Sequence, residues 1–283
     1  MKISSNQAIR KTVFIASFIF LFFVSHTFAQ EQSIPEDLFM EIACFKAKGP
    51  DAQDFFKKWS KPFHEEMIRQ GILVGWDFYT VDYPNGSDCD CRFRAVRVFR
   101  GIGTLDKIKS TKTREAIVQK IWPNKTLKDL GAEFQKNVEL KHSEVYRLVD
   151  ALIPTKTKSK IMVVNFMDVK PGDREAYLEM EDAIFKPLHS ASNKEGKLID
   201  WFIAEREIPY GMKVKTDYIT VDKFDNYEDY FSNNFMELFK SVHPTMNAKE
   251  AMIKMAEKRK LIKSEIWRIV PEICADASSS EKK

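Results

Sequence analysis

The sequence has 283 residues and contains two similar halves, and this internal repeat constrains the fold more than any other feature. The tetrapeptide Lys61-Pro62-Phe63-His64 returns as Lys186-Pro187-Leu188-His189 at a spacing of 125 residues. Trp76 and Trp201 are separated by the same spacing, so the match extends beyond one short motif. Self-similarity at a fixed period indicates that one structural unit is present twice.

The first 29 residues have the layout of a secretory signal peptide. Three basic residues precede an apolar run of 13 residues at 12–24, and Thr-Phe-Ala at 27–29 offers a cleavage site with a small last residue. We therefore expect the mature chain to begin at Gln30 and to be exported, either to the periplasm or as a secreted protein. An uncleaved membrane anchor is the alternative, although the run is short for crossing a bilayer.

The charge and composition of the remaining chain exclude several classes of partner. The formal net charge of +4 includes the three basic residues of the leader, so the mature chain is close to neutral. A nucleic-acid-binding protein needs clustered positive charge, and we expect no nucleic-acid partner. The hydrophobic content of 44% supports a packed core. No later apolar stretch is long enough for a transmembrane helix, so no membrane partner is expected after cleavage. The oligomeric state stays open.

Four cysteines, Cys44, Cys89, Cys91 and Cys274, allow three complete disulfide pairings. None of them is repeated in the other half, and a single Cys-x-Cys without a partner pair is a weak zinc signal. We therefore expect no metal site, and either one disulfide or buried thiols in an oxidising compartment.

Each half shows the element order strand-helix-strand-strand-helix-strand. An Asp at 51 and another at 173 follow a turn signal, and each is expected to cap the first helix of its half. The Lys-Pro pair is expected to kink or restart that helix, and Pro123 and Pro244 to split the second helical region. The expected strands are 38–47, 75–82, 92–99, 143–149, 161–166, 200–207, 216–224 and 264–270, and the expected helical regions are 52–70, 105–137, 174–194 and 227–259.

This order is the ferredoxin-like βαββαβ arrangement, an antiparallel sheet with both helices on one face. The other face is apolar, so two copies are expected to pack sheet against sheet in an α+β fold. The sequence resembles the dimeric α+β barrel superfamily, in a tandem single-chain version that forms a pseudo-dimeric barrel. The resemblance covers roughly residues 36–150 and 158–272, after the leader at 1–29 and before a flexible tail at 273–283.

The resemblance implies a range of functions rather than one. Known activities in the superfamily include cofactor-free and heme-linked monooxygenases, heme degradation, chlorite breakdown and small-ligand sensing, with ligands between sheet and helices or inside the barrel. Fold alone does not choose among them. Phosphate-binding, nucleophile-elbow and zinc-protease motifs do not occur in the mature sequence, so nucleotide-binding and hydrolase functions lack support.

The repeated His64 and His189 are the first candidates for catalysis, because histidine serves as an acid, a base or a ligand of heme or metal. The alternative is a histidine at a helix end that bonds to backbone and packs on the following tryptophan. Trp76 and Trp201 either line a ligand cavity or anchor the core.

A second repeated pattern supplies charged candidates. The segment Ser143-Glu144-Val145-Tyr146-Arg147 returns as Ser264-Glu265-Ile266-Trp267-Arg268 at a spacing of 121 residues. Side chains alternate along a strand, so Glu144 and Arg147 lie on opposite faces, as do Glu265 and Arg268. One residue of each pair must face a packed layer, as part of an ion pair or as a ligand clamp.

We therefore expect an exported protein that binds a small apolar or aromatic ligand. The first alternative is a monooxygenase-like or heme-binding enzyme that uses His64 or His189. The second is a non-catalytic accessory protein of extracellular polysaccharide breakdown. The sequence requires no cofactor, and heme is the one cofactor that the alternatives include.

Overall fold

The computed structural model describes residues 37–84, 91–156, 159–208 and 216–276, which belong to one compact unit spanning residues 34–283. The expected signal peptide, the turn residues 85–86 and 209–211, Cys89 and the tail residues 277–283 lie outside the described residues. No helix in the described ranges combines the length and the apolarity that crossing a membrane requires.

The structure confirms the expected element order in both halves. The first half consists of β1 (Leu38–Ala47), α1 (Ala52–Phe55), the π-helical η1 (Phe56–Ser60), α2 (Lys61–Arg69), β2 (Gly75–Tyr83), β3 (Phe93–Arg100), α3 (Thr104–Lys109), α4 (Thr111–Ile121), α5 (Leu127–Asn137) and β4 (Val138–Ala151).

The second half repeats this order after a short connection. It consists of β5 (Ile161–Val169), the 3₁₀ turn η2 (Pro171–Asp173), α6 (Arg174–Met180), the π-helical η3 (Glu181–Phe185), α7 (Lys186–Lys194), β6 (Asp200–Ile208), β7 (Tyr218–Phe224), α8 (Tyr227–Phe231), α9 (Phe235–Val242), α10 (Ala248–Lys258) and β8 (Arg259–Ile269). The short strand β9 (Ala275–Asp276) pairs with β2 and occupies the start of the segment expected to be a flexible tail.

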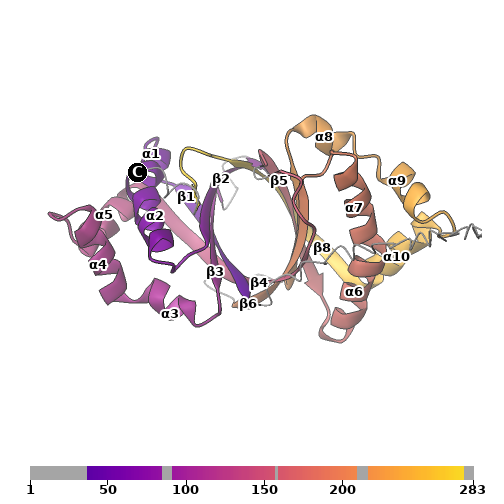
Figure 1. Cartoon of the computed structure of the whole chain (residues 1–283), viewed down its shortest axis with the longest axis horizontal. Coiled ribbons are helices and arrows are strands. Elements are labelled where there is room, and N and C mark those ends of the chain that lie inside the picture. Colours follow the sequence, from indigo (N-terminus) through magenta and orange to yellow (C-terminus); the bar gives the residue numbers. More distant parts are fainter. Residues whose placement is uncertain (1–36, 85–90, 157–158, 209–215, 277–283) are drawn as a thin grey trace, which may run out of the picture. The chain divides into compact units, whose positions relative to one another are not determined.

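The two four-stranded sheets join edge to edge into a closed antiparallel barrel. The strands follow the order β2-β3-β1-β4 in the first half and β6-β7-β5-β8 in the second, and the pairs β4–β6 and β2–β8 close the ring. Closure removes the exposed edges that an open sheet would leave. Helices α1–α5 cover the outer face of the first sheet and α6–α10 that of the second (Figure 1). The expected sheet-to-sheet α+β barrel is thus confirmed.

Strand alternation divides the core into three layers. On β1, Met40 and Ile42 point into the barrel, whereas Phe39 and Phe45 point outward beneath the helices. The barrel interior contains buried residues of both halves. The buried residues of each outer layer come from one half only, apart from the C-terminal Val270, Ile273 and Ala275 in the first layer. A cavity in an outer layer therefore belongs to one half.

In each half the first helical region continues through the Lys-Pro pair, because the turn before the pair is π-helical and therefore wider than an α-helical turn. A five-residue π-helical segment, η1 or η3, ends at the residue before Lys61 or Lys186. Proline has no N–H and its ring clashes with the carbonyl four residues earlier, so a wider turn lets the helix pass without breaking. The predicted interruption is confirmed in this form. The splits near Pro123 and Pro244 are also confirmed, because α4 and α9 end before these prolines.

The predicted helix caps at Asp51 and Asp173 were wrong. Neither side chain accepts a hydrogen bond from its helix. The backbone of Asp51 has φ −83° and ψ 6°, whereas a capping residue needs an extended backbone to turn its side chain toward the helix amides. Side-chain caps occur instead at Ser110, Thr126, Asn226, Asn234 and Asn247, all in the second helical region of a half.

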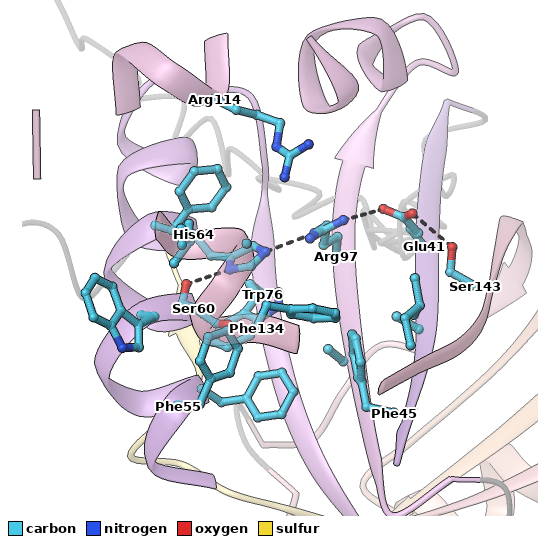
Figure 2. Close-up of a pocket in the computed structure, with 18 of the residues that line it drawn as sticks. Glu41, Phe45, Phe55, Ser60, His64, Trp76, Arg97, Arg114, Phe134 and Ser143 are labelled. Carbon is cyan, nitrogen blue, oxygen red and sulfur yellow. Dashed lines mark hydrogen bonds and ion pairs between the residues drawn. The ribbon is translucent and has the colours of Figure 1, made fainter. Parts of the chain in front are cut away.

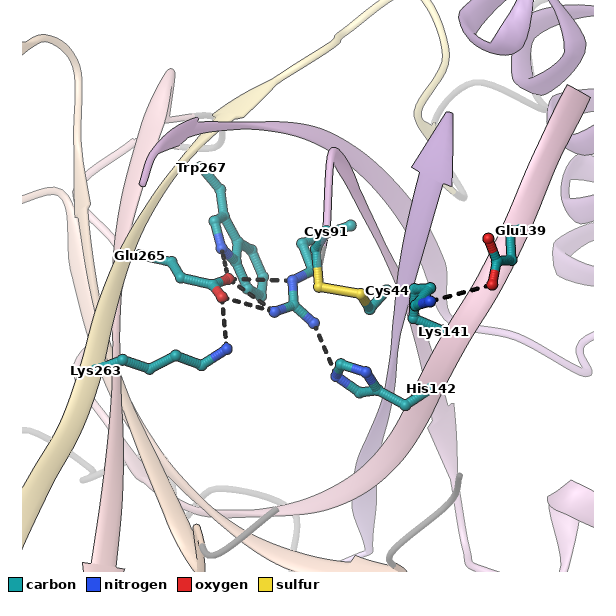
Figure 3. Close-up of a disulfide and its surroundings, with 9 residues drawn as sticks. Cys44, Cys91, Glu139, Lys141, His142, Lys263, Glu265 and Trp267 are labelled. Carbon is teal, nitrogen blue, oxygen red and sulfur yellow. Dashed lines mark hydrogen bonds and ion pairs between the residues drawn. A yellow bond between two sulfur atoms is a disulfide. The ribbon is translucent and has the colours of Figure 1, made fainter. Parts of the chain in front are cut away.

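One disulfide joins Cys44 on β1 to Cys91 just before β3, with a Cα–Cα distance of 5.2 Å (Figure 3). It is buried in the barrel interior, beside strands that already pair. Cys274 is a free thiol. Of the two expected outcomes, one disulfide is therefore confirmed for the described residues.

Candidate functional site

A cavity of about 360 Å³ lies between the sheet and the helices of the first half (Figure 2). This volume is within the range of small-molecule sites. Helices α1–α5 and strands β1–β4 all contribute to its walls. One part of the wall is aromatic, formed by Phe45, Phe55, Phe56, Trp59, Phe63, Trp76 and Phe134.

Strand alternation brings charged residues to one corner of this cavity. Glu41 has the same parity as Phe39 and Phe45 on β1, so it points outward beneath the helices. Arg97 has the parity of the outward Phe93 on β3, and it pairs directly with Glu41. The two strands therefore place a carboxylate and a guanidinium side by side under an apolar layer.

A register shift between β1 and β4 adds two more residues to the wall. Cys44 pairs with His142, but the next residue, Phe45, pairs with Leu140, so β4 has one extra residue at this point. Such a bulge changes the parity of the strand. Leu140 and Ser143 are three positions apart and would face opposite sides of a regular strand. Because of the bulge, both line the cavity.

Glu41 is held by three donors. Its side chain is 3% exposed and accepts hydrogen bonds from Arg97 Nη1 at 2.8 Å, Lys109 Nζ at 2.6 Å and Ser143 Oγ at 3.1 Å. Burial alone would raise the pKa of Glu41, but the charges of Arg97 and Lys109 outweigh it and lower the pKa to about 2. The carboxylate is therefore ionised at neutral pH and balances one of its two cationic neighbours.

His64 is locked between backbone, tryptophan and arginine. Its ring stacks on Trp76 with centroids 4.3 Å apart. Nδ1 lies 2.6 Å from the carbonyl oxygen of Ser60, and Arg97 donates its Nε–H to Nε2 at 2.9 Å. A carbonyl only accepts and this Nε–H only donates, so the neutral ring carries its proton on Nδ1. Burial and the charge of Arg97 hold the pKa of His64 well below its usual value.

Arg114 completes the charged corner. It extends from α4 into the cavity toward Arg97 (Figure 2). Within the described part of the chain it has no hydrogen bond or ion pair, and burial together with the charge of Arg97 lowers its pKa. Arginine stays protonated at neutral pH, so Lys109, Arg97 and Arg114 outnumber the single carboxylate of Glu41. The corner has an excess of positive charge.

The second half repeats the histidine stack, with an acidic residue in the place of Arg97. His189 stacks on Trp201 with centroids 5.1 Å apart, and its Nδ1 lies 3.3 Å from Asp222 Oδ1. Asp222 pairs with Val163 as Arg97 pairs with Glu41, so the two positions correspond. Burial and the charge of the nearby Glu181 raise the pKa of Asp222 to about 7.

The repeated Glu144 and Glu265 point into the barrel and are buried. The hydroxyl of Tyr146 donates to Glu144 at 2.8 Å, and the indole N–H of Trp267 donates to Glu265 at 2.7 Å. The aromatic residue two positions further along thus supplies the donor in both halves. This role explains why Tyr and Trp exchange at that position.

Glu265 also forms a buried ion pair across the barrel (Figure 3). Arg94 on β3 donates from Nη2 to both carboxylate oxygens, at 2.8 and 2.9 Å, and Lys263 donates at 2.7 Å. Burial alone would raise the pKa of Glu265, but these cations lower it to about 2. The pair links the two halves from inside the barrel.

The repeated arginines lie on the other face, as alternation predicts. Arg147 pairs with Glu205 and Glu207, each at 2.7 Å, and Arg268 pairs with Asp82 at 2.8 Å. The lining of the aromatic cavity includes none of the four repeated charged residues, Glu144, Arg147, Glu265 and Arg268. Their side chains form ion pairs and hydrogen bonds within the protein.

Sequence reasoning missed Glu41, Arg97 and Arg114 because it searched among repeated residues. These residues have no counterpart of the same charge in the second half. A signal was nevertheless present: Glu41 and Arg97 interrupt the apolar parity of their strands, at positions that should face the helices.

Comparison with known proteins identifies the fold. No family model and no curated protein matches the sequence. A solved structure from Fusobacterium nucleatum, provisionally named a monooxygenase, is 11% identical, with 86% of this chain and 96% of that chain covered and a TM-score of 0.54. A similarly named protein from Lactobacillus acidophilus is 12% identical, with 85% and 97% covered and a TM-score of 0.50.

A mutant chlorite dismutase from Candidatus Nitrospira defluvii is 10% identical to this chain, with 84% of this chain and 93% of that chain covered and a TM-score of 0.50. At such identities the similarity concerns the fold alone. The chain has the fold of the dimeric α+β barrel proteins, with both half-barrels in one polypeptide.

Proposed function

We propose that the cavity of the first half binds a small aromatic molecule and that the protein is a monooxygenase-like enzyme acting on it. The observation that supports this most is the pairing of an aromatic wall with a cationic corner in one cavity. The fold is shared with two proteins provisionally named monooxygenases.

The aromatic wall suits a flat ring. Aromatic side chains pack on one another in offset or edge-to-face geometry and gain more than their buried area alone provides. Phe134 from α5 reaches across to Phe45 and Phe55, with ring centroids 5.9 and 5.8 Å apart. Trp76 is different, because His64 covers its face and the ring is buried. Trp76 therefore forms the floor of the site, and the phenylalanines provide the contact surface.

The cationic corner suits an oxidation that passes through an anion. A ring CH₂ that is conjugated with a carbonyl gives up a proton to water and becomes an enolate, and positive side chains stabilise that charge. Dioxygen then oxidises the carbon: R₂CH₂ and O₂ give R₂C=O and H₂O, so one oxygen atom enters the product and the other leaves as water. Arg97, in the same corner of the cavity, would hold the enolate oxygen.

The activity is testable with anthrone, a tricyclic substrate of this kind. Dioxygen consumption and anthraquinone formation should depend on the protein and should fall about 10-fold or more in Phe134→Ala, because the ring loses its packing surface. Phe231→Ala is the matched control, since Phe231 is an exposed phenylalanine of the second half. Turnover no faster than in buffer, for anthrone and for dihydroxynaphthalenes alike, would contradict the enzymatic proposal.

Heme binding is a second candidate function, and one contact in the second half favours it. His64 does not fit an axial ligand, since both of its ring nitrogens are engaged. His189 fits better: Asp222 Oδ1 lies 3.3 Å from Nδ1, close enough for a small shift to form the hydrogen bond that would orient a ligating imidazole, and Nε2 would then be the atom to hold the iron. Bound heme would supply redox chemistry. Heme titration should give a Soret shift that His189→Ala removes and His64→Ala keeps; no shift in the wild type would exclude heme.

Export and tandem duplication also belong to this proposal. The leader-like N-terminus and the buried Cys44–Cys91 disulfide support an oxidising compartment. N-terminal sequencing of protein from the periplasm or medium should start at Gln30. Duplication is supported by the matching element order, the two π-helical segments and the two histidine stacks. No feature of the described residues favours polysaccharide binding, and a positive glycan array would reopen it.

A further inference from the structure

The cavity of the first half has more positive charge than its protein environment balances. Glu41 is the acidic residue in the cavity wall, and it is already bonded to Arg97 and Lys109. Arg114 adds a third cation without a carboxylate partner among the described residues. A partly buried guanidinium needs hydrogen-bond acceptors, because desolvation without compensation is costly.

Local structure does not account for Arg114. It lies near the N-terminal end of α4, whose first turn contains no acidic residue, and the helix dipole disfavours cations at that end. The charged residue that affects its pKa is Arg97, and the two positive charges repel each other. The position is therefore unfavourable in the protein without a ligand, and it becomes favourable once an anion lies between the arginine and the cavity.

We infer that the cavity ligand is an aromatic acid whose carboxylate is bound by Arg114. This inference rests on the proposed function and adds the class of ligand to it. A guanidinium binds a carboxylate through two parallel hydrogen bonds, which fixes the orientation as well as the charge. The phenylalanine wall would then hold the ring. Because the phenylalanines and Arg114 line the same cavity, the ring and the carboxylate would belong to one molecule.

The second half supports the assignment by contrast. The spacing of 121 residues that relates the later parts of the halves places Phe235 where Arg114 stands, and Asp222 replaces Arg97. An anionic ligand would meet a carboxylate and a phenylalanine there. The carboxylate site therefore belongs to the first half alone.

The test compares 2-naphthoate with 2-naphthamide, which has a similar shape and no charge, by isothermal titration calorimetry at neutral pH. The wild type should bind the acid at least about 10-fold more tightly than the amide, a difference of about 1.4 kcal/mol. Arg114→Gln should abolish this preference, because it should weaken binding of the acid far more than binding of the amide. Arg114→Lys should restore part of it, because the charge returns without the two-pronged geometry.

Arg100→Gln is the matched control. Arg100 is an exposed arginine of the same half, paired with Asp37 outside the cavity, and its loss should leave the preference intact. Arg114→Gln breaks no internal bond in the described chain, so its thermal unfolding temperature should stay equal to that of the wild type or rise. That expectation separates the ligand role from a structural one.

The outcomes are distinguishable. Equal binding of acid and amide in the wild type would overturn the inference and leave aromatic binding in place. A preference that survives Arg114→Gln would also overturn it, since another group would then hold the carboxylate. If neither naphthalene derivative binds, and Phe134→Ala changes nothing, the proposed function itself fails.

Discussion

The two halves of the barrel share one structural device and differ in what lies beside it. In both, a histidine near the end of the first helix stacks on a tryptophan at the start of the next strand. In the first half the neighbour is Arg97, which donates to His64 Nε2. In the second it is Asp222, which lies against His189 Nδ1. The aromatic stack is common to both, whereas the cation beside it in the first half is replaced by a carboxyl group in the second.

This difference shows which residues define the function. A feature present in both halves is explained by what both halves need, namely attachment of the helix to the sheet. The feature found in one half only, the cluster of Glu41, Arg97, Lys109 and Arg114, is where a ligand site can have specialised. The repeat is therefore most informative where it fails.

The largest loss of stability is expected when Arg97 is replaced by the residue found at the corresponding position of the second half, an aspartate. Arg97→Asp removes the main partner of the buried Glu41 and brings a second carboxylate beside it. Leaving a buried charge without its partner is costly, and we expect the free energy of unfolding to fall by about 5 kcal/mol. Urea denaturation measures it. The reciprocal Asp222→Arg would show whether the second half tolerates the other charge, and a loss below about 1 kcal/mol in Arg97→Asp would contradict the Glu41 assignment.

The disulfide is the next difference between the halves. The positions that correspond to Cys44 and Cys91 are Phe166 and Thr216, so the second half is not cross-linked there. The Cys44–Cys91 bond closes a loop of 47 residues, and its removal by Cys44→Ser with Cys91→Ser should cost about 3 kcal/mol. Dithiothreitol should lower the melting temperature of the wild type and leave that of the double variant unchanged. Cys274→Ala, which removes the free thiol found among the described residues, is the control.

The carboxylate of the second half provides a pH test with a defined sign. The pKa of Asp222 is raised from 3.8 to about 7, so folding protonates it. Stability from this group is present below pH 3.8 and is lost as the pH rises to about 7, because only the unfolded state ionises freely in that window. Asp222→Asn removes the titration.

Asp222→Asn should therefore gain stability over the wild type as the pH increases. We expect little difference at about pH 4 and a gain of up to about 4 kcal/mol at about pH 8. Thermal unfolding of both proteins across this range gives the answer. A gain that is largest in acid would reverse the sign and show that Asp222 is ionised in the folded protein.

The repeat and the strand patterns predicted the architecture because they depend on many residues at once. Eight strands, two split helical regions and the barrel follow from alternation, proline positions and element order. The caps at Asp51 and Asp173 failed because capping depends on the backbone angles of a single residue, which sequence does not determine. The π-helical segment before each Lys-Pro pair was not predicted either, because the sequence shows only that a proline disturbs the helix and not how the helix adapts to it.

The site was harder to predict than the fold. His64 and Trp76 line the cavity as candidates should, but their contacts are with each other and with Ser60 and Arg97. Arg114 lies on a different element from Arg97, 17 positions later in the chain, and only the folded structure brings its side chain toward Arg97. A ligand site depends on such non-local contacts, whereas a strand pattern is local.

The smallest difference is expected at the repeated arginines, where the halves should behave alike. Arg147 and Arg268 form ion pairs on the outer face of the sheet and remain 30% and 47% exposed. Such pairs contribute little, because water screens the charges and the side chains lose freedom when they pair. Arg147→Gln and Arg268→Gln should each cost less than about 1 kcal/mol in urea denaturation. A larger loss in one variant would show that the strand pair at that junction of the two sheets, β4–β6 for Arg147 or β2–β8 for Arg268, depends on its ion pair. The two arginines would then differ in their contribution to stability although both halves have arginine at this position.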